Sequence, residues 1–508
     1  MLDFFLYDEK SPMIFTTPTF WYFFAFVLVI YQFIYQNMNL RNLFLMVVSM
    51  FFYYKGGGLF IIMLVFSTIL DYQFGKIVYA ATSQKTKKQI ILLSVIVNLA
   101  ILGYFKYTFF LADTINFIFN TDLKGYDFLA ALSNSLFGTR FDISNIILPV
   151  GISFYTFQSM SYVIDVYRGE LKPVQNIWDY AFFVSFFPQL VAGPIVRATD
   201  FAPQMYEPYR LSHAEYGRAL FLIINGLTKK ILISDYISLN FVDRVFSEPL
   251  KYSGFENLLA VYGYALQIYC DFSGYTDVAI GVALLLGFRL TLNFNSPYKA
   301  QNITDFWRRW HISLSTWLKD YLYISLGGNR HGRFRTYLNL FLTMFLGGLW
   351  HGASIRFVIW GTLHGVALAI HKMFMEFVVG KKGKKSSTTI TAIFERIFYG
   401  FITFHFVCFC WIFFRAENLR IVNEVLTQIT TNFNVAIMGD VFISYYKIIF
   451  IMALGYFIHW LPTSFKDEFR ETFIELPEIT KAIVIVGIML VLFQVRSAEV
   501  QPFIYFQF

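Results

Sequence analysis

The chain has 508 residues, of which 57% are hydrophobic, 20% aromatic and only 15% charged, and its mean hydropathy is +0.54. This composition excludes a water-soluble globular protein, because repeated apolar runs of about twenty residues match a hydrocarbon core roughly 30 Å thick. We therefore expect an all-α polytopic membrane protein. The net charge of +8 is explained by Lys and Arg retained in cytoplasmic loops, and no basic patch suggests a nucleic-acid partner.

The first 145 residues predict four membrane helices and an external segment. The spans are expected at 19–36, 43–54, 59–80 and 89–110, with a glycine turn at 56–58. The basic cluster from Lys85 to Lys88 favours a cytoplasmic loop, which places the acidic N-terminus outside. That N-terminus lacks the basic start of a signal peptide, so the first span is expected to stay as an anchor. Residues 113–145 predict an external excursion with one interfacial helix.

Helix-breaking residues enter the apolar segments after residue 145. They are Pro149, Gly151, Pro188, Gly193 and Pro194. Non-helical backbone at membrane depth is tolerated only where protein or a watery cavity surrounds it. This part of the chain therefore predicts a lined cavity.

The remaining spans are less regular and bring the expected total to about eleven. They are predicted at 182–196, 219–237, 258–290, 337–349, 355–374, 393–414, 443–461 and 482–493. The run 258–290 is either one long tilted helix or a broken pair. The basic and polar stretch 381–389 predicts a cytoplasmic loop.

Several familiar site patterns are absent from the sequence. Cys270, Cys408 and Cys410 lie in apolar runs and indicate neither a disulfide framework nor a metal knuckle. Gly-x-Ser-x-Gly, His-x-x-x-His and His-Glu-x-x-His do not occur, which argues against a serine-hydrolase elbow and a metal centre. We therefore expect no metal.

The polar stretch around residues 302–319 predicts an amphipathic helix at the membrane interface. Asn302 or Thr304 can cap a helix that starts near Asp305. Three-and-four spacing would place Trp307, His311 and Leu318 on one face and Arg308 on another, with Arg308 and Arg309 directed to water or phosphate. The alternative is that the arginines and tryptophans only anchor the helix.

A second Trp-His pair, Trp350 and His351, lies among apolar residues and next to Gly347, Gly348 and Gly352. A titratable group at membrane depth costs about 2.5 to 3.5 kcal/mol when charged, so it needs a partner or a function. A neutral imidazole is suited to remove a proton from a hydroxyl near pH 7. His351 is therefore the candidate general base, with Trp350 walling one side.

Other readings of the polar residues stay open. His351 could instead be a structural histidine, and His364 or His371 could orient it or only pack. Arg330, His331, Arg333 and Arg335 could bind a phosphate-bearing donor or simply mark the cytoplasmic side. Asp271 and Asp277 are expected to pair with arginines such as Arg289 or Arg308, with a direct proton-handling role for these aspartates as the alternative.

Five motifs in order resemble the membrane-bound O-acyltransferases, and most of all the bacterial alginate O-acetyltransferase branch. They cover residues 149–158, 187–195, 271–277, 306–315 and 349–352, and the ending 503–508 is also similar to that branch. The resemblance implies a ring of about eleven helices around a central funnel. It implies one membrane acyltransferase domain with N-terminal helices 1–145, a catalytic core 146–375 and C-terminal helices 376–508.

The resemblance also implies site residues and partners. The family's catalytic histidine falls on His351 and its second polar site residue on His311. The substrate-binding residues are expected to be Arg308, Arg309, Trp307, Trp310, Trp350, Asp271 and Asn302. No cofactor is expected to be permanently bound; acetyl-CoA or another cytoplasmic acyl thioester would be the donor. A polysaccharide acceptor and an extracytoplasmic hydrolase-like partner are expected at a bacterial inner membrane.

Two alternatives remain at this stage. A teichoic-acid D-alanyl transfer protein shares the Trp-His-Gly motif but takes its acyl group from a carrier protein. A polysaccharide or proton transporter with gating histidines would belong to a different class.

Overall fold

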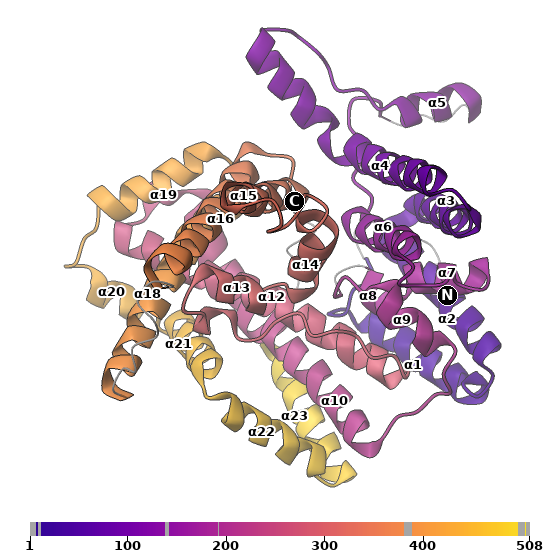
Figure 1. The fold of residues 1–508 in the computed structure, drawn as a ribbon. Helices are drawn as coiled ribbons and strands as arrows, with labels where there is room; N and C mark the ends of the chain where they lie inside the picture. The colour runs from indigo at the N-terminus through magenta and orange to yellow at the C-terminus, as the bar shows by residue number, and fades with distance from the viewer. Residues whose placement is uncertain are drawn as a thin grey trace.

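The structure is a computed structural model that describes residues 7–8, 12–137, 142–190, 193–379, 389–495 and 503. The chain is built from helices joined by short connections (Figure 1). The N-terminal helices are α1 (Pro18–Ile34), α2 (Met38–Gly57), η2 (Gly58–Phe60), α3 (Ile61–Ala80), α4 (Gln84–Phe119), α5 (Phe128–Phe137), α6 (Ile152–Arg168), α7 (Ile177–Ser185), α8 (Phe187–Leu190) and α9 (Ala198–Met205).

The middle of the chain carries the longest buried helix and the broken helices of the candidate site. Its elements are α10 (His213–Leu227), η3 (Thr228–Asp235), η4 (Ser238–Val242), α11 (Asp243–Ser247), η5 (Pro249–Lys251), α12 (Gly254–Leu285), η6 (Pro297–Lys299), α13 (Ile303–Arg309), α14 (Ile312–Trp317), η7 (Leu318–Tyr323), α15 (Arg333–His351), α16 (Ile355–Phe374) and η8 (Met375–Val379). The C-terminal helices are α18 (Thr389–Arg415), α19 (Leu419–Thr431), α20 (Met438–Ser444), α21 (Tyr446–Trp460), α22 (Thr463–Glu475) and α23 (Glu478–Val495).

The protein is a multi-pass membrane protein, as its composition predicts. Within the described chain, six helices are long and apolar enough to cross a membrane, or seven spans if α20 and α21, which are bent by 88°, form one. The six are Met38–Ala80, Gln84–Phe119, Gly254–Leu285, Ile355–Val378, Ile393–Arg415 and Glu478–Val495. The predicted total of about eleven is a count that this length criterion does not test.

The helical segments predicted for the N-terminal part are confirmed. The turn expected at the three glycines falls at Gly58, whose φ of +58° suits glycine. The excursion predicted at 113–145 begins later than expected, because α4 continues to Phe119, and it contains the short helix α5; its external position stays a prediction. The acidic residues at 1–6 and 9–11, the basic loop at 380–388 and the ending 504–508 lie outside the described residues.

The prediction of a membrane span at 182–196 is wrong. This segment forms the end of the nine-residue α7 and the four-residue α8, with a break at Phe186, whose ψ is 109°. Its aromatic side chains are fully buried against the neighbouring helices; Phe182, Phe183, Phe186 and Phe187 all have 0% exposure. A segment buried in protein and a segment facing lipid have the same apolar composition. This run is apolar because protein surrounds it.

Helix α12 is the central element of the fold. It is one unbroken helix of 32 residues, so the run predicted at 258–290 is a single long helix and not a broken pair. Within its most apolar stretch of 18 residues, 89% of the residues are buried. Ser253 and Glu256 form a capping box at its start. Gly274 of α12 faces Gly226 of α10 closely enough that a Cβ on either would clash with the other's carbonyl oxygen. Small residues let these two backbones meet.

Helices α15 and α16 form a tightly packed hairpin. A Cβ added at Gly348 would lie 2.9 Å from the Cα of Gly361, and one at Gly361 would lie 3.0 Å from the Cα of Gly348. The predicted span at 355–374 coincides with α16. Because the two backbones touch, the end of α15 at His351 is held against α16.

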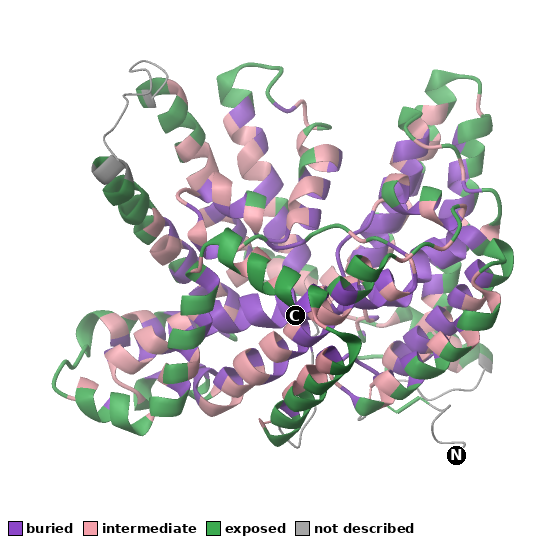
Figure 2. Cartoon of the chain, turned by 90° about the horizontal axis from the view of Figure 1, so that it is seen from below, coloured by how far each residue is buried: buried purple, intermediate pink, exposed green. Residues whose placement is uncertain are grey.

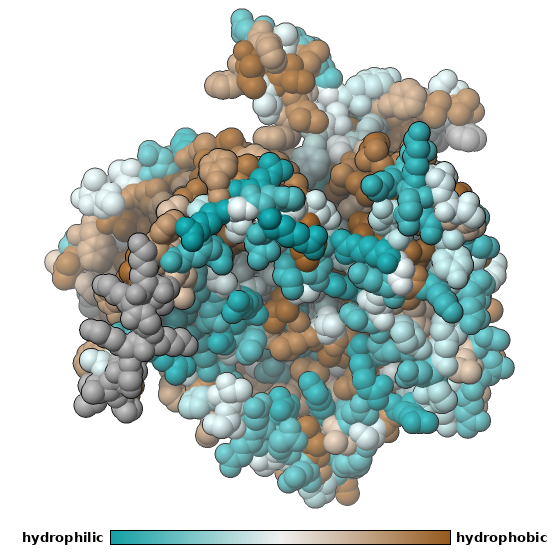
Figure 3. Space-filling view, in the orientation of Figure 1, coloured by the Kyte–Doolittle hydropathy of each residue, from teal (hydrophilic) through white to brown (hydrophobic). Residues whose placement is uncertain are grey.

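Buried residues gather where the helices cross in the middle of the molecule, and exposed residues lie toward the tips (Figure 2). In the orientation of Figure 1, the visible face is largely hydrophilic, with hydrophobic side chains gathered over α4 (Figure 3). Large apolar side chains are exposed on several of the outer helices, among them Phe33, Phe117, Phe394 and Ile483. This distribution fits a protein whose outer helices face lipid.

Candidate functional site

The helix is interrupted at Trp310 and His311, so the prediction of one continuous amphipathic helix is wrong. Asn302 caps α13, as predicted, by accepting a hydrogen bond from the backbone N–H of Asp305 (2.8 Å). The helix ends at Arg309, and α14 begins at Ile312. His311 between them has φ +43°, in the left-handed region that non-glycine residues rarely adopt. A residue held there signals a local constraint.

Asn293 supplies that constraint. Its side-chain oxygen accepts hydrogen bonds from the backbone N–H (3.1 Å) and the hydroxyl (2.9 Å) of Ser313, and it lies 3.2 Å from Nδ1 of His311. Its backbone carbonyl accepts from the N–H of Ile312 at 2.9 Å. Asn293 and His311 are both fully buried. The orientation of the His311 ring is therefore fixed by a side chain eighteen positions upstream.

His351 is the last residue of α15 and sits in an aromatic cage. Its ring centroid lies 5.0 Å from that of Trp350, 5.0 Å from that of Trp360 and 5.2 Å from that of Phe414. The His311 ring also contacts Trp350, at 6.3 Å between centroids. The two Trp-His histidines, far apart in sequence, thus meet around one indole.

Lys106 of α4 holds the end of α15 in place. Its ammonium donates to the backbone carbonyls of Trp350 (2.6 Å) and His351 (3.0 Å), and the Tyr107 hydroxyl donates to that of Leu349 (2.7 Å). The last carbonyls of a helix have no intrahelical donor, and a cation is favoured there by the helix dipole. The backbone of His351 is therefore anchored to the N-terminal helices.

His364 joins α13 to α16 behind this cage. It is fully buried, accepts the indole N–H of Trp307 at 3.3 Å, and its ring centroid lies 4.7 Å from that of Trp360. Trp360 in turn contacts His351. His371 lies 2.9 Å from the Thr304 hydroxyl. His364 thus supports the cage through Trp360.

The other predicted site residues divide into core and surface. Trp310 is fully buried, with its ring stacked on Phe306 at 5.8 Å. Arg309 pairs with Asp305 at 2.9 Å, whereas Arg308 is exposed. Arg308 is therefore accessible to a ligand, and Trp310 belongs to the core beneath it.

The predicted arginine partners of the aspartates are wrong. Asp271 pairs with Lys230, which also bridges to Asp235 at 2.7 Å, and Asp277 pairs with Lys229 at 2.7 Å. Arg289 pairs instead with Glu215. The two lysines lie in η3, a π-helix packed against α12. Asp271 therefore belongs to a buried ionic cluster with Lys230 and Asp235.

A cavity of about 770 Å³ lies beside the cage, and Trp350 is one of the residues that line it. The His351 ring lies 5.0 Å from this indole, centroid to centroid, and His351 is 4% exposed. The described lining of the cavity includes Trp350 but not His351. An open path to the His351 ring itself stays a prediction.

Sequence reasoning missed Lys106 and Asn293. The single lysine within the apolar run 89–110, four residues before its end, is a signal that was present, because a cation at membrane depth needs a partner. Asn293 gave no comparable signal, since its role depends on the fold.

Comparisons with known proteins agree with these features. Residues 170–414 match the membrane-bound O-acyltransferase family. The chain is 42% identical over 387 residues to the probable alginate O-acetylase AlgI of Pseudomonas syringae (76% of this chain, 69% of that protein). It is 36% identical over 444 residues to the peptidoglycan O-acetyltransferase of Helicobacter pylori (82% and 79%). It is 32% identical over 290 residues to the teichoic acid D-alanyltransferase of Bacillus subtilis (54% and 70%).

Proposed function

Since the chain belongs to the membrane-bound O-acyltransferase family, and is therefore an O-acyltransferase, we propose that it moves an acetyl group from a cytoplasmic thioester donor across the bacterial inner membrane for O-acetylation of an exported or cell-envelope polysaccharide. The observation that carries this proposal is the meeting of His311 and His351 around Trp350. Relatives named as alginate O-acetylase and peptidoglycan O-acetyltransferase support acetyl as the acyl group.

In the proposed reaction His351 acts as the general base. It takes the proton of an acceptor hydroxyl, whose oxygen attacks the thioester carbonyl to form the new C–O bond. The C–S bond then breaks, and the leaving thiolate takes the proton back from His351, so that ester and free thiol result. General base catalysis contributes about 10²- to 10⁴-fold.

His311 is proposed to donate a hydrogen bond to the oxyanion that forms at the carbonyl. Asn293 lies 3.2 Å from Nδ1. Because an amide oxygen can only accept, Nδ1 carries a proton, and Nε2 can donate to the oxyanion only when the ring is protonated on both nitrogens. An oxyanion donor contributes about 10²- to 10³-fold. The acetyl group would reach the polymer with the help of an extracytoplasmic hydrolase-like partner.

Membrane vesicles of known orientation test the proposed function. Inverted vesicles supplied with labelled acetyl-CoA are expected to form base-labile labelled ester on envelope polysaccharide, and right-side-out vesicles are not. Vesicles lacking the chain are the control. Equal labelling with and without the chain, in both orientations, would overturn the proposal.

The D-alanyl alternative has one observation in its favour, the similarity to the teichoic acid D-alanyltransferase. The same inverted vesicles distinguish it, because that activity would use a D-alanine-charged carrier protein in place of acetyl-CoA. The transporter alternative conflicts with the family to which the chain belongs.

Arg308 is proposed to contact the donor, because it is exposed at the end of α13. We expect Arg308→Ala to raise the KM for acetyl-CoA about tenfold, since a hydrogen bond to a charged group is worth about 1.5 kcal/mol or more. Steady-state kinetics in inverted vesicles measure this. Arg420→Ala, an exposed arginine of α19, is the control, and equal donor dependence in both variants would refute the contact.

Lys106 is proposed to position the His351 ring. Lys106→Met leaves the last carbonyls of α15 without that donor, and we expect kcat to fall about 10- to 100-fold with the donor KM unchanged, because misplacement by 1 Å can cost about 100-fold. Lys106→Arg, which keeps a cationic donor, is expected to recover most of the rate. A KM change alone, or a Lys106→Arg variant no better than Lys106→Met, would contradict this role.

A further inference from the structure

The cavity beside Trp350 is apolar and has the size of a ligand site. It lies between α4 and α6 on one side and η7 and α15 on the other, and its volume of about 770 Å³ falls within the range of about 300–1,000 Å³ typical of small-molecule sites. Where Trp350 lines the cavity, Phe157 stacks on Trp317 (3.8 Å between centroids) and on Trp350 (5.3 Å). Such a wall suits hydrocarbon.

The cavity is long enough for an alkyl chain. Along α6 its lining runs from Phe157 to Arg168, a distance of about 16 Å at 1.5 Å per residue. Along α4 the lining is longer and runs from Ile91 to Leu111, about 30 Å. Since the hydrocarbon core of a bilayer is about 30 Å thick, the α6 side covers about one leaflet and the α4 side the whole core.

The cavity is also flanked by lipid-facing side chains. Leu92, Leu99 and Leu111 of α4 line it and are 59%, 47% and 53% exposed, and Leu346 of α15 is 41% exposed. In the most apolar stretch of 18 residues of α4, only 22% of the residues are buried. A chain can therefore enter from the side, directly from the membrane.

The outer end of the cavity carries positive charge. Lys106 and Phe157 both contact Trp350. From there α6 lines the cavity forward to Arg168, and α4 lines it back to Ile91 and also onward to Leu111. The cluster from Lys85 to Lys88 lies less than two turns before Ile91, so it adds to the charge of Arg168. Basic residues beside a membrane attract anionic lipid headgroups.

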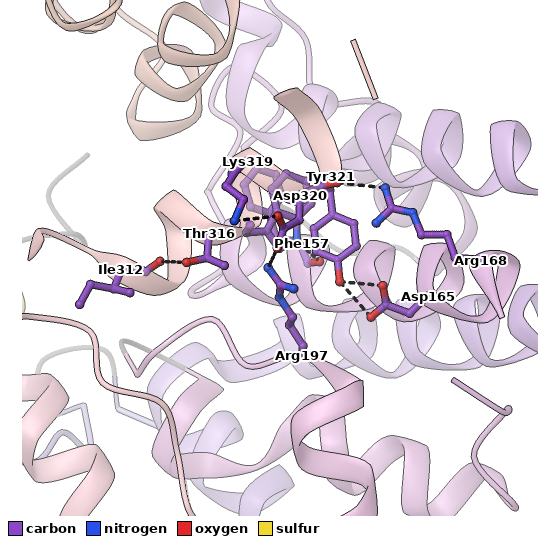
Figure 4. A network of polar contacts seen from close by, with 10 residues as sticks. Phe157, Asp165, Arg168, Arg197, Ile312, Thr316, Lys319, Asp320 and Tyr321 are labelled. Carbon is purple, nitrogen blue, oxygen red and sulfur yellow. Dashed lines mark hydrogen bonds and ion pairs between the residues drawn. The ribbon is translucent and has the colours of Figure 1, made fainter. Parts of the chain in front are cut away.

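Arg168 is held at this end by a polar network (Figure 4). Its guanidinium donates to the backbone carbonyl of Asp320 at 2.9 Å and lies over the Tyr321 ring at 5.2 Å. The Tyr321 hydroxyl donates to both carboxylate oxygens of Asp165 (2.7 and 2.9 Å), and Arg197 pairs with Asp320 at 2.6 Å. The exposed cation is thus fixed at the mouth of an apolar groove.

We propose that this cavity seats one acyl chain of an anionic phospholipid, with the phosphate beside Arg168 and the end of the chain against Trp350. The distance of about one leaflet between Phe157 and Arg168 along α6, the lateral exposure and the cationic mouth all fit that occupant. Because Trp350 also contacts both histidines, a seated chain would contact the same indole as they do. The proposal concerns lipid binding and does not depend on which polymer is acetylated.

Gly103 offers a direct test, because it lines the cavity and an added Cβ there would meet nothing within 4 Å. Gly103→Leu therefore fills the groove without a backbone clash. Gly487→Leu on α23 is the matched control, since its Cβ also meets nothing within 4 Å and it lies on another apolar helix. Detergent-purified protein is titrated with phosphatidylglycerol and binding is read by native mass spectrometry.

We expect the parent and Gly487→Leu to bind phosphatidylglycerol at least tenfold more tightly than Gly103→Leu. In Arg168→Gln the preference for phosphatidylglycerol over phosphatidylcholine is expected to fall, while Arg420→Gln keeps it. Chain-brominated phosphatidylglycerol is expected to quench tryptophan fluorescence in the parent and less in Gly103→Leu.

Three results would overturn the proposal. The first is equal binding of phosphatidylglycerol by the parent and Gly103→Leu. The second is equal binding of phosphatidylglycerol and phosphatidylcholine by the parent. The third is a single-span protein that co-purifies with the parent and is lost from Gly103→Leu while lipid binding is unchanged, because the cavity would then belong to a protein partner.

Discussion

Replacing His351 with alanine is expected to lower acyl transfer at least 100-fold, because the proposed base then no longer takes the proton of the acceptor hydroxyl. General base catalysis contributes about 10²- to 10⁴-fold. The measurement is the O-acetyl content of envelope polysaccharide in cells that carry the parent or the variant at matched protein level.

A second variant separates catalysis from folding. Alanine leaves space between Trp350, Trp360 and Phe414, whereas His351→Gln keeps most of the volume and is expected to be equally inactive with a melting temperature close to that of the parent. His331→Ala, in an exposed loop, is the control and should keep full activity. Unchanged acetylation in both His351 variants would show that His351 is not the general base.

Lys230→Met is expected to destabilise the protein by about 3–5 kcal/mol, since removing one partner of a buried ion pair leaves the other charge buried without it. Lys230 is 3% exposed and Asp271 also 3%, and Asp235 shares the same ammonium. Thermal unfolding in detergent, followed by size-exclusion chromatography, measures the loss.

The matched control is Lys251→Met, which breaks a pair with Glu248 whose side chains are 68% and 57% exposed. Exposed pairs are worth about 0–1 kcal/mol, so its melting temperature should stay close to that of the parent. Adding Asp271→Leu to Lys230→Met is expected to recover part of the stability, because one buried charge is removed. Equal melting temperatures for the Lys230 and Lys251 variants would show that the cluster is not a stabilising core.

Apolar periodicity and length predict the outer helices well. The predicted span at 355–374 coincides with α16, and the expected excursion after the fourth helix contains α5. The cap at Asn302 was predictable because capping is a local interaction between a side chain and the next turn. The ordered motifs were enough to identify the family, which the relatives confirm.

The failures concern residues whose surroundings are set by distant parts of the chain. The segment 182–196 is as apolar as a membrane span, yet protein covers it. The helix predicted through His311 breaks because Asn293, on a separate segment, bonds the residues after it. Asp271 pairs with a lysine from η3 that no local spacing reveals. The convergence of the two histidines could be expected from the resemblance but not from their spacing.

The contact between Gly348 and Gly361 has a mechanical consequence. Because the backbones of α15 and α16 touch there, we expect the two helices to move together, with the His351 imidazole at the end of α15. Movement of this pair away from α4 would break the hydrogen bonds from Lys106 and Tyr107 to the final carbonyls of α15. We therefore expect displacement of the His351 backbone to require that these three bonds open.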